Sequence, residues 1–178
     1  MGVHHCFILP GLNNSGPEHW QTHWENDYGF TRIQQHNWDY PVAGNWLQTI
    51  EKTLSAYNYT DIVLIGHSLA CCTIVKWAQQ YQHTIKAALL VAPSDTEAAS
   101  YPPGTTGFTP MPVFTLPFKS MVIASSNDAY VTLQRSTHFA TSWGSKLINA
   151  GPLGHINAAS GIGHWPQGYS FLQQLINP

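Results

Sequence analysis

Several features that would point to a particular class of protein are scarce or missing in this chain of 178 residues. Only 9% of the residues are charged, and the formal net charge is −2. The chain therefore lacks the basic surface that binds nucleic acid or anionic membranes. No apolar run approaches the ~20 residues that are needed to span a bilayer. The length suits one domain and is short for two.

The cysteines and the N-terminal residues indicate a reducing compartment. Cys6, Cys71 and Cys72 include an adjacent pair, so they do not form a disulfide framework. The N-terminal residues show neither a basic segment nor a long apolar core, and we expect no signal peptide. We therefore expect a cytoplasmic protein that binds neither nucleic acid nor membrane. The sequence does not identify a protein partner.

Strand and helix patterns alternate along the whole chain. The expected strands lie at residues 4–9, 30–34, 62–65, 85–91, 121–125 and 146–149. The expected helices lie at residues 17–28, 45–57, 69–81, 130–143 and 169–176. This alternation predicts one α/β domain over residues 1–178, with about six parallel strands in the order 2-1-3-4-5-6 and helices on both faces. The proline-rich residues 94–117 are expected to form a long loop over the sheet rather than a large cap domain.

The stretch from Thr60 to Trp77 has the features of a strand, a tight turn and a helix. Residues 62–65 are apolar and mostly β-branched, and no proline or glycine occurs from Leu69 to Ala92. Between them lies Gly66-His67-Ser68-Leu69-Ala70. A serine between a strand and a helix, with glycine two residues before it, matches the nucleophile elbow G-x-S-x-G, in which Ala70 here replaces the second glycine. The pattern predicts Ser68 as a nucleophile.

A serine nucleophile needs a base and a carboxylate, and these are expected where the carboxyl ends of the parallel strands meet. Asp128 follows the fifth expected strand and Asp95 follows the fourth. We favour Asp128 as the acid, although a turn or a helix cap would also explain an aspartate there. His155 and His164 both lie in the loop after the last strand. Spacing alone gives only a slight preference for His155 as the base.

The remaining parts of an acyl-transfer site can also be assigned to residues. The backbone N–H of Leu69, at a helix N-terminus, and that of Leu12, after the first strand, are the expected donors to an oxyanion. Trp38 and Trp165 follow strand ends and are candidates for the wall of the substrate pocket. We expect the loops at residues 35–42 and 94–117 to shape that pocket.

Other motifs in the chain do not indicate a cofactor or a metal. His19 and His23 are four residues apart on an expected helix, but no glutamate follows His19 and no third ligand is evident. Gly161-Ile162-Gly163 is not followed by a helix with the spacing of a dinucleotide site, and no phosphate-binding loop motif is present. We therefore expect no metal and no cofactor.

Five segments together resemble a known family. They are PGLNNSGPEHWQTHWE at residues 10–25, WDYP at 38–41, GHSLAC at 66–71, SSNDAYV at 125–131 and GHINAASGIGHWPQG at 154–168. They resemble the small serine hydrolases related to retinoblastoma-binding protein nine, also called the YdeN-like group. The resemblance implies an α/β-hydrolase fold without a large cap and a triad of Ser68, Asp128 and His155. On this basis we prefer His155 to His164 as the base.

The retinoblastoma-binding role of that family is not carried over to this chain. That role depends on an L-x-C-x-E segment, and here Leu69-Ala70-Cys71 is followed by Cys72-Thr73, without the glutamate. We expect a serine hydrolase that cleaves small ester, thioester or amide bonds through an acyl-enzyme, with a small-molecule acyl substrate. A metal-free perhydrolase or acyltransferase would use the same triad. A binding module of the same fold with an idle triad is the alternative from another class.

Overall fold

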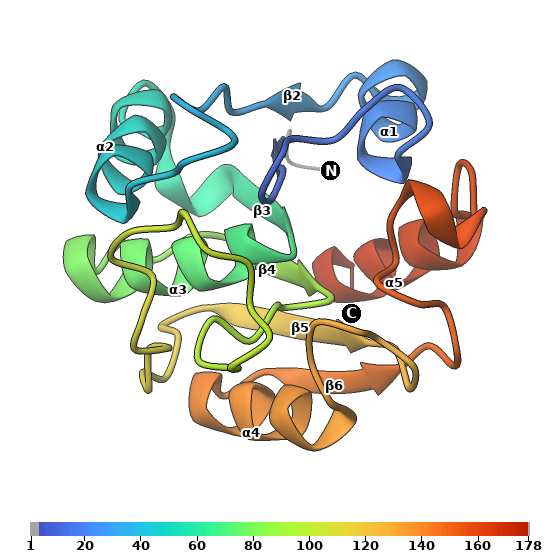
Figure 1. Ribbon diagram of the computed structural model, residues 1–178. Coiled ribbons are helices and arrows are strands. Elements are labelled where there is room, and N and C mark those ends of the chain that lie inside the picture. The colour runs from blue at the N-terminus through green and yellow to red at the C-terminus, as the bar shows by residue number, and fades with distance from the viewer. Residues whose placement is uncertain (1–3, 178) are drawn as a thin grey trace.

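The computed structural model describes residues 4–177, which form one six-stranded sheet flanked by helices (Figure 1). The strands are β1 (His5–Leu9), β2 (Thr31–Arg32), β3 (Ile62–His67), β4 (Ala87–Val91), β5 (Lys119–Ala124) and β6 (Lys146–Asn149). The helices are α1 (Trp20–Tyr28), α2 (Ala43–Leu54), α3 (Leu69–Tyr81), α4 (Leu133–Trp143) and α5 (Pro166–Ile176), with short 3₁₀ turns at Tyr59–Asp61 and Ala158–Ser160.

The strands are parallel and run in the order β2-β1-β3-β4-β5-β6, which confirms the predicted topology. The central strand β3 pairs with β1, where Leu9 is in register with Gly66, and with β4, where His67 is in register with Val91. All six residues of β3 are buried, as expected for a strand covered on both faces. The carboxyl ends of these three strands therefore meet directly beside Ser68.

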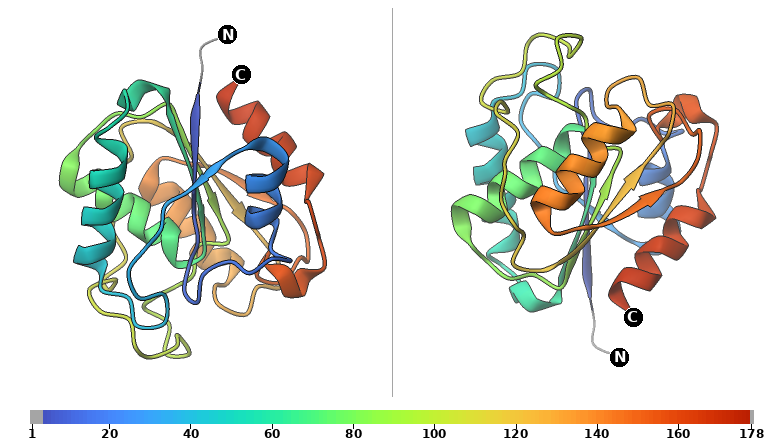
Figure 2. Two further views of the ribbon diagram at one scale, coloured as in Figure 1. Left: turned by 90° about the horizontal axis from the view of Figure 1, so that it is seen from above. Right: turned by 90° about the horizontal axis from the view of Figure 1, so that it is seen from below.

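The helices cover the two faces of the sheet in two groups (Figure 2). Helices α1 and α5 pack on one face, where Trp20 and Leu172 join Ile8 and Ile65 of the strands in one apolar cluster. Helices α2, α3 and α4 contribute to the cluster on the other face, together with strand residues such as Leu64. Successive strand residues point to opposite faces, so each strand contributes to both clusters. The result is the three-layer α/β arrangement that the alternating pattern predicts.

Four helices begin at residues other than those expected. Helix α2 begins at Ala43 rather than at Asn45, and α4 begins at Leu133 rather than at Tyr130. Helix α1 begins at Trp20 rather than at Pro17, because His19 is its N-cap and the His19 Nδ1 atom accepts the N–H of Gln21 at 3.1 Å. Helix α5 begins at Pro166, three residues before the expected start at Tyr169. Proline is well suited to the first turn of a helix, where its missing N–H would have no partner.

The long loop at residues 93–117 is held against the body of the protein. Thr106 forms a parallel bridge with Val42, and its carbonyl oxygen accepts the N–H of Ala43 at 2.8 Å. Phe108 is completely buried in the core. This segment is an ordered loop, and it is not a separate cap domain.

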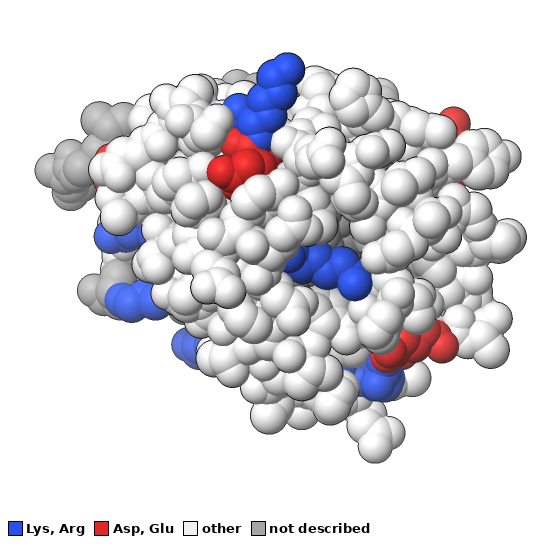
Figure 3. Space-filling model, turned by 90° about the vertical axis from the view of Figure 1, so that its left-hand side faces the viewer, with Lys and Arg blue, Asp and Glu red and all other residues white. Residues whose placement is uncertain are grey.

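Charged side chains are sparse on the surface, as the composition requires. Figure 3 shows that the face on the side of α2 and α3 carries only scattered charged groups among uncharged ones. Over residues 4–177, none of the helices has the length and apolar character that crossing a membrane demands.

Candidate active site

Ser68 lies in a strained turn between β3 and α3. Its backbone has φ 58° and ψ −120°, in a region that residues other than glycine rarely adopt. Its N–H donates to the carbonyl oxygen of Val91 at 2.9 Å, which anchors the turn to β4. Strain of this kind persists only where the surrounding structure enforces it, and it is common at functional sites. The turn lies between a strand and a helix, at the position where the sequence predicts a nucleophile elbow.

Two glycines allow the chain to pack closely around Ser68. A Cβ atom on Gly66 would lie 2.6 Å from Cδ1 of Ile74. A Cβ atom on Gly11, in the loop after β1, would lie 2.8 Å from Cβ of Ser68 and 2.9 Å from the carbonyl oxygen of His67. Ala70, at the position of the second glycine of the motif, is buried with its methyl group accommodated. Within the motif, a side chain at position 66 would therefore require Ile74 to shift, and Gly11 brings the loop after β1 against the turn.

A continuous set of hydrogen bonds joins Ser68, His155 and Asp128. The Nε2 atom of His155 lies 2.8 Å from Oγ of Ser68, although the two residues are 87 positions apart in the sequence. On the other side of the ring, Nδ1 lies 2.9 Å from Oδ1 and 2.8 Å from Oδ2 of Asp128. The Asp128 side chain is fully buried, and that of His155 is 10% exposed. The structure thus brings together the three side chains that the sequence singled out.

The alternative acid and base candidates, Asp95 and His164, are bound to other side chains. Asp95 accepts two hydrogen bonds from Arg135, at 2.6 and 3.0 Å. The His164 side chain is 61% exposed and pairs with Asp27. Asp128 is not the N-cap of the following helix, since Thr132 holds that position in α4. These placements leave His155 and Asp128 as the pair at Ser68.

Polar contacts between two loops position His155 over the serine. The side-chain oxygen of Asn127 accepts the N–H of Gly154 at 2.7 Å, and it also accepts the hydroxyl of Ser125 at 2.9 Å. The same Ser125 hydroxyl accepts the N–H of Leu153 at 2.9 Å. These bonds tie the loop after β6 to the loop after β5. Ser125 and Asn127 lie in the SSNDAYV segment of the family resemblance, but their residue types alone indicate no role in positioning the base.

The side chain of His67 is hydrogen-bonded to the backbone of His155. The Nε2 atom of His67 lies 2.9 Å from the His155 carbonyl oxygen, and only a protonated nitrogen can bond to that acceptor. Burial, reinforced by the neighbouring His19 and His155, lowers the pKa of His67 well below its usual value. His67 is therefore neutral and contributes a hydrogen bond without adding charge beside the base.

Two backbone N–H groups are free beside Ser68. Leu12 lies in the cavity wall, next to Gly11. Leu69 is the first residue of α3, where no acceptor exists within the helix. Among the residues that the structure describes, neither N–H donates to a protein acceptor outside the regular helix and strand bonds. The two groups are thus available to an anionic oxygen formed at this position.

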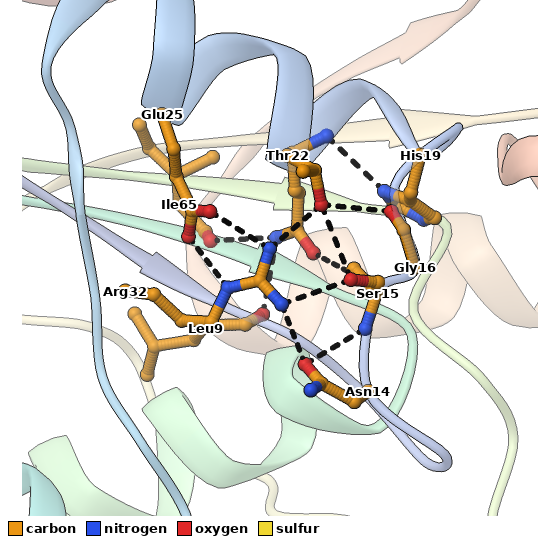
Figure 4. A network of polar contacts seen from close by, with 10 residues as sticks. Leu9, Asn14, Ser15, Gly16, His19, Thr22, Glu25, Arg32 and Ile65 are labelled. Carbon is orange, nitrogen blue, oxygen red and sulfur yellow. Dashed lines mark hydrogen bonds and ion pairs between the residues drawn. The ribbon is translucent and has the colours of Figure 1, made fainter.

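A buried polar network fixes the loop that carries Leu12 (Figure 4). The Arg32 guanidinium donates to Oδ1 of Asn14 at 2.8 Å and to the carbonyl oxygen of Ser15 at 2.9 Å, and it is also paired with Glu25. The Ser15 hydroxyl donates to Oε1 of Gln21 at 2.7 Å, and the side-chain NH₂ of Gln21 donates to the carbonyl oxygens of Leu9 in β1 and Ile65 in β3, each at 3.2 Å. The loop is therefore attached both to α1 and to the strands beside Ser68.

A cavity of about 340 Å³ opens above Ser68. Its wall is formed by the loop after β1, by Ser94, Tyr101 and Pro102 from the loop after β4, by Tyr130, and by residues 155 and 157–159. The loop at residues 94–117 thus shapes the cavity as expected. Of the described residues, none at positions 35–42 lines it.

The two tryptophans proposed as pocket residues lie elsewhere. Trp165, the N-cap of α5, is 3% exposed and packs against both Trp20 and Trp24. Trp38 packs edge-to-face on Trp46, with ring centroids 5.5 Å apart. Neither is among the described residues that line the cavity, which corrects the expectation from the sequence. Both indole rings pack against other aromatic side chains instead, as is common for large apolar side chains.

The described part of the chain, residues 4–177, has no cluster of three or more His, Cys, Asp or Glu side chains with the geometry of a metal site. The two histidines that resembled a metal pair face different neighbours. The ring of His19 packs against that of His67, at 4.7 Å between centroids, whereas His23 stacks on His164 at 4.2 Å.

The protein has a three-layer α/β arrangement and a strained turn at Ser68, with the His155 imidazole and the Asp128 carboxylate beside it. These features are typical of the α/β-hydrolase class. Comparison with known proteins agrees with this class. A family model described as "Serine hydrolase" matches residues 6–174, so the chain belongs to the serine hydrolase family. A search of curated proteins gave no match.

Solved structures place the chain more narrowly within that family. A putative YdeN-like hydrolase from Pectobacterium atrosepticum is 30% identical, with 98% of this chain and 91% of that chain covered and a TM-score of 0.86. The ydeN gene product of B. subtilis is 19% identical, with 99% and 100% covered and a TM-score of 0.83. Est1E from Butyrivibrio proteoclasticus shares the fold at 13% identity, with 99% and 89% covered and a TM-score of 0.69. The chain is a small YdeN-like α/β serine hydrolase.

Proposed function

We propose that the protein cleaves small carboxylic ester, thioester or amide bonds through an acyl-enzyme formed on Ser68. The observation that supports this proposal most is the unbroken hydrogen-bonded series from Oγ of Ser68 through the His155 ring to the buried Asp128 carboxylate. A serine hydroxyl is a weak nucleophile alone, and such a series supplies the base that it needs.

In the proposed reaction, Ser68 Oγ attacks the substrate carbonyl carbon while His155 Nε2 takes the hydroxyl proton. Asp128 holds the ring with its proton on Nδ1 and stabilises the imidazolium that forms. The tetrahedral intermediate then expels the alcohol, thiol or amine, which receives its proton from His155. A water molecule, deprotonated by the same ring, attacks the acyl-enzyme and releases the acid and the free serine.

The backbone N–H groups of Leu12 and Leu69 are the proposed donors to the oxyanion. Both lie beside Ser68, and Leu69 is at the N-terminus of α3, where the helix dipole favours negative charge. One donor of this kind lowers the barrier by about 3 kcal/mol in acyl-transfer enzymes. Gly11 allows the first of these donors to approach, because it packs directly on the Ser68 Cβ atom.

Ester turnover tests the proposed function directly. Purified protein should hydrolyse p-nitrophenyl esters. The dependence of turnover on acyl length, measured with a series of esters, should reveal the longest acyl chain that the cavity accommodates. Ser68→Ala should remove this activity, whereas Ser55→Ala, an exposed serine at the end of α2, should retain it. Equal turnover by the wild type and Ser68→Ala would refute the proposal, and an absence of turnover for every ester would favour an idle site.

A further inference from the structure

The wall of the cavity above Ser68 carries no formal charge. Among the described residues that form it, none is Lys, Arg, Asp or Glu, and its polar groups are amides, hydroxyls and imidazoles. A charged ligand would lose its hydration there without meeting an opposite charge, which is costly. The cavity therefore suits an uncharged ligand.

Two buried polar atoms of residues in this wall, Nε2 of His19 and Oγ of Ser94, have no hydrogen-bond partner within the described residues. The Nε2 atom of His19 makes no hydrogen bond there, and the residue is 4% exposed. Its Nδ1 atom accepts the N–H of Gln21, and burial, followed by the charge of Arg32, lowers the pKa of His19 to about 3. The ring is neutral with its proton on Nε2, which is an unpartnered donor buried behind the surface of the wall.

Asn14, in the same wall, presents a second donor in a fixed orientation. Its Oδ1 atom accepts hydrogen bonds from Arg32 at 2.8 Å and from the N–H of Ser15 at 2.8 Å. Both partners only donate, so the oxygen of the amide must face them and the NH₂ group must face away. Among the described residues, Nδ2 of Asn14 has no acceptor, and Asn14 lines the cavity. The ion pair of Arg32 with Glu25 holds this arrangement in place (Figure 4).

We propose that the substrate is an uncharged acyl compound that carries an ether or hydroxyl oxygen in its acyl part, and that Nδ2 of Asn14 donates a hydrogen bond to this oxygen. The inference rests on the proposed function, since it names the substrate class of the Ser68 site.

The position of Asn14 assigns this contact to the acyl part rather than to the leaving group. Asn14 belongs to the same loop as Leu12, the proposed oxyanion donor, two residues away. The leaving group must lie near Nε2 of His155, since it takes its proton from that atom. The acyl chain is thereby directed toward the wall that the loop after β1 forms.

Matched pairs of esters test the proposal. p-Nitrophenyl methoxyacetate, 3-methoxypropionate and 4-methoxybutyrate are compared with the butyrate, valerate and hexanoate, so that one ether oxygen replaces one CH₂ at three depths. The readout is the ratio of kcat/KM, ether over alkyl, within each pair. Comparing this ratio between the wild type and Asn14→Asp cancels the difference in intrinsic reactivity of the two esters.

Asn14→Asp is suited to this test because it keeps the oxygen that binds Arg32 and replaces only the donor by an acceptor. For at least one pair, the ratio should fall at least about tenfold in Asn14→Asp, the effect of losing one good hydrogen bond. Asn45→Asp, an exposed residue on α2, adds the same charge away from the cavity and should leave the ratio unchanged. Equal ratios in the wild type and Asn14→Asp for all three pairs would overturn the proposal.

A binding measurement separates this inference from the proposed function. In Ser68→Ala, which cannot turn over, the N-methyl amides of methoxyacetic and butyric acid and their longer homologues are titrated by NMR. An ether amide should bind more tightly than its alkyl partner, and adding Asn14→Asp should remove the difference. Equal binding of both members in every pair, or no saturable binding, would overturn the inference even if the enzyme is active. Turnover that does not depend on Ser68 would instead refute the proposed function.

Discussion

The Nδ1 atom of His155 lies 2.8 Å from Oδ2 of Asp128, and the Asp128 side chain is completely shielded from solvent. This contact sets which ring nitrogen of His155 carries the proton, because the carboxylate accepts only from a protonated nitrogen. The lone pair of Nε2 then faces Ser68. The relationship leads directly to the first prediction.

Asp128→Asn should lower kcat/KM for an ester by about 10⁴-fold, as loss of the carboxylate does in other triads. The amide no longer holds the required tautomer and no longer stabilises the imidazolium. The thermal unfolding midpoint and the circular dichroism spectrum show whether the variant is folded.

Asp95→Asn is the matched comparison for that variant. Asp95 binds Arg135 and not His155, so its loss should reduce stability by roughly 1–2 kcal/mol and leave kcat/KM within a few-fold of the wild type. A collapse of the rate in Asp95→Asn, with little change in Asp128→Asn, would show that the acid has been assigned to the wrong residue.

Gly11→Ala should impair turnover while preserving the fold. Its new methyl group would lie 2.8 Å from Cβ of Ser68 and 2.9 Å from a backbone oxygen, so the loop with Leu12 must shift away from the turn. Displacements of about 1 Å at a reacting centre can cost about 10²-fold in rate, and we expect a loss of kcat of that order. Gly44→Ala, where nothing lies within 4 Å of the added atom, should keep full activity. Equal rates in both variants would exclude a tight requirement at Gly11.

Arg32→Lys should lower kcat by about tenfold and stability by roughly 1–2 kcal/mol, because an ammonium group cannot reproduce the planar set of bonds to Asn14, Ser15 and Glu25. Arg135→Lys disrupts a comparable pair with Asp95 far from the loop. It should reduce stability alone. Urea denaturation and ester kinetics on both variants distinguish the two roles, and an unchanged kcat in Arg32→Lys would contradict the positioning role of Arg32.

Acid should destabilise the folded state through His19. Burial, with smaller contributions from the charges of Arg32, His155 and His23, lowers the pKa of His19 to about 3, whereas the unfolded chain takes up the proton near pH 6.5. The unfolded state therefore binds more protons between these values, and stability falls as the pH falls. From pH 7 to pH 5 the loss due to His19 should be about 2 kcal/mol.

The variant His19→Asn tests this pH dependence, since asparagine also accepts a hydrogen bond at an N-cap and does not titrate. The free energy of unfolding is measured by urea denaturation at pH 7 and pH 5. The difference between the two pH values should be smaller in His19→Asn than in the wild type. The same difference in both proteins would show that His19 is not the responsible group.

The sequence alone predicted the strand order, because alternating strand and helix patterns restrict the possible topologies. It also predicted a turn at Ser68, because the residue types around the serine favour one. It did not decide between His155 and His164, which occupy the same loop, until the family resemblance was considered. The roles of Arg32, Gln21 and Asn127 could not be predicted. The bonds that connect them to the strands and to the loops after β1 and β6 reach partners 12 to 44 residues away, and no spacing rule links them. Whether a tryptophan after a strand lines a pocket or enters the core depends on packing, which a one-dimensional pattern does not contain.

Covalent labelling of the serine hydroxyl tests the account most directly. The protein is treated with a fluorophosphonate probe, and the modified peptide is identified by mass spectrometry in the wild type, Ser68→Ala and Ser55→Ala. The account predicts one adduct, on Ser68, that is absent from Ser68→Ala and unchanged in Ser55→Ala. An unlabelled wild type, or an adduct that persists in Ser68→Ala, would contradict it.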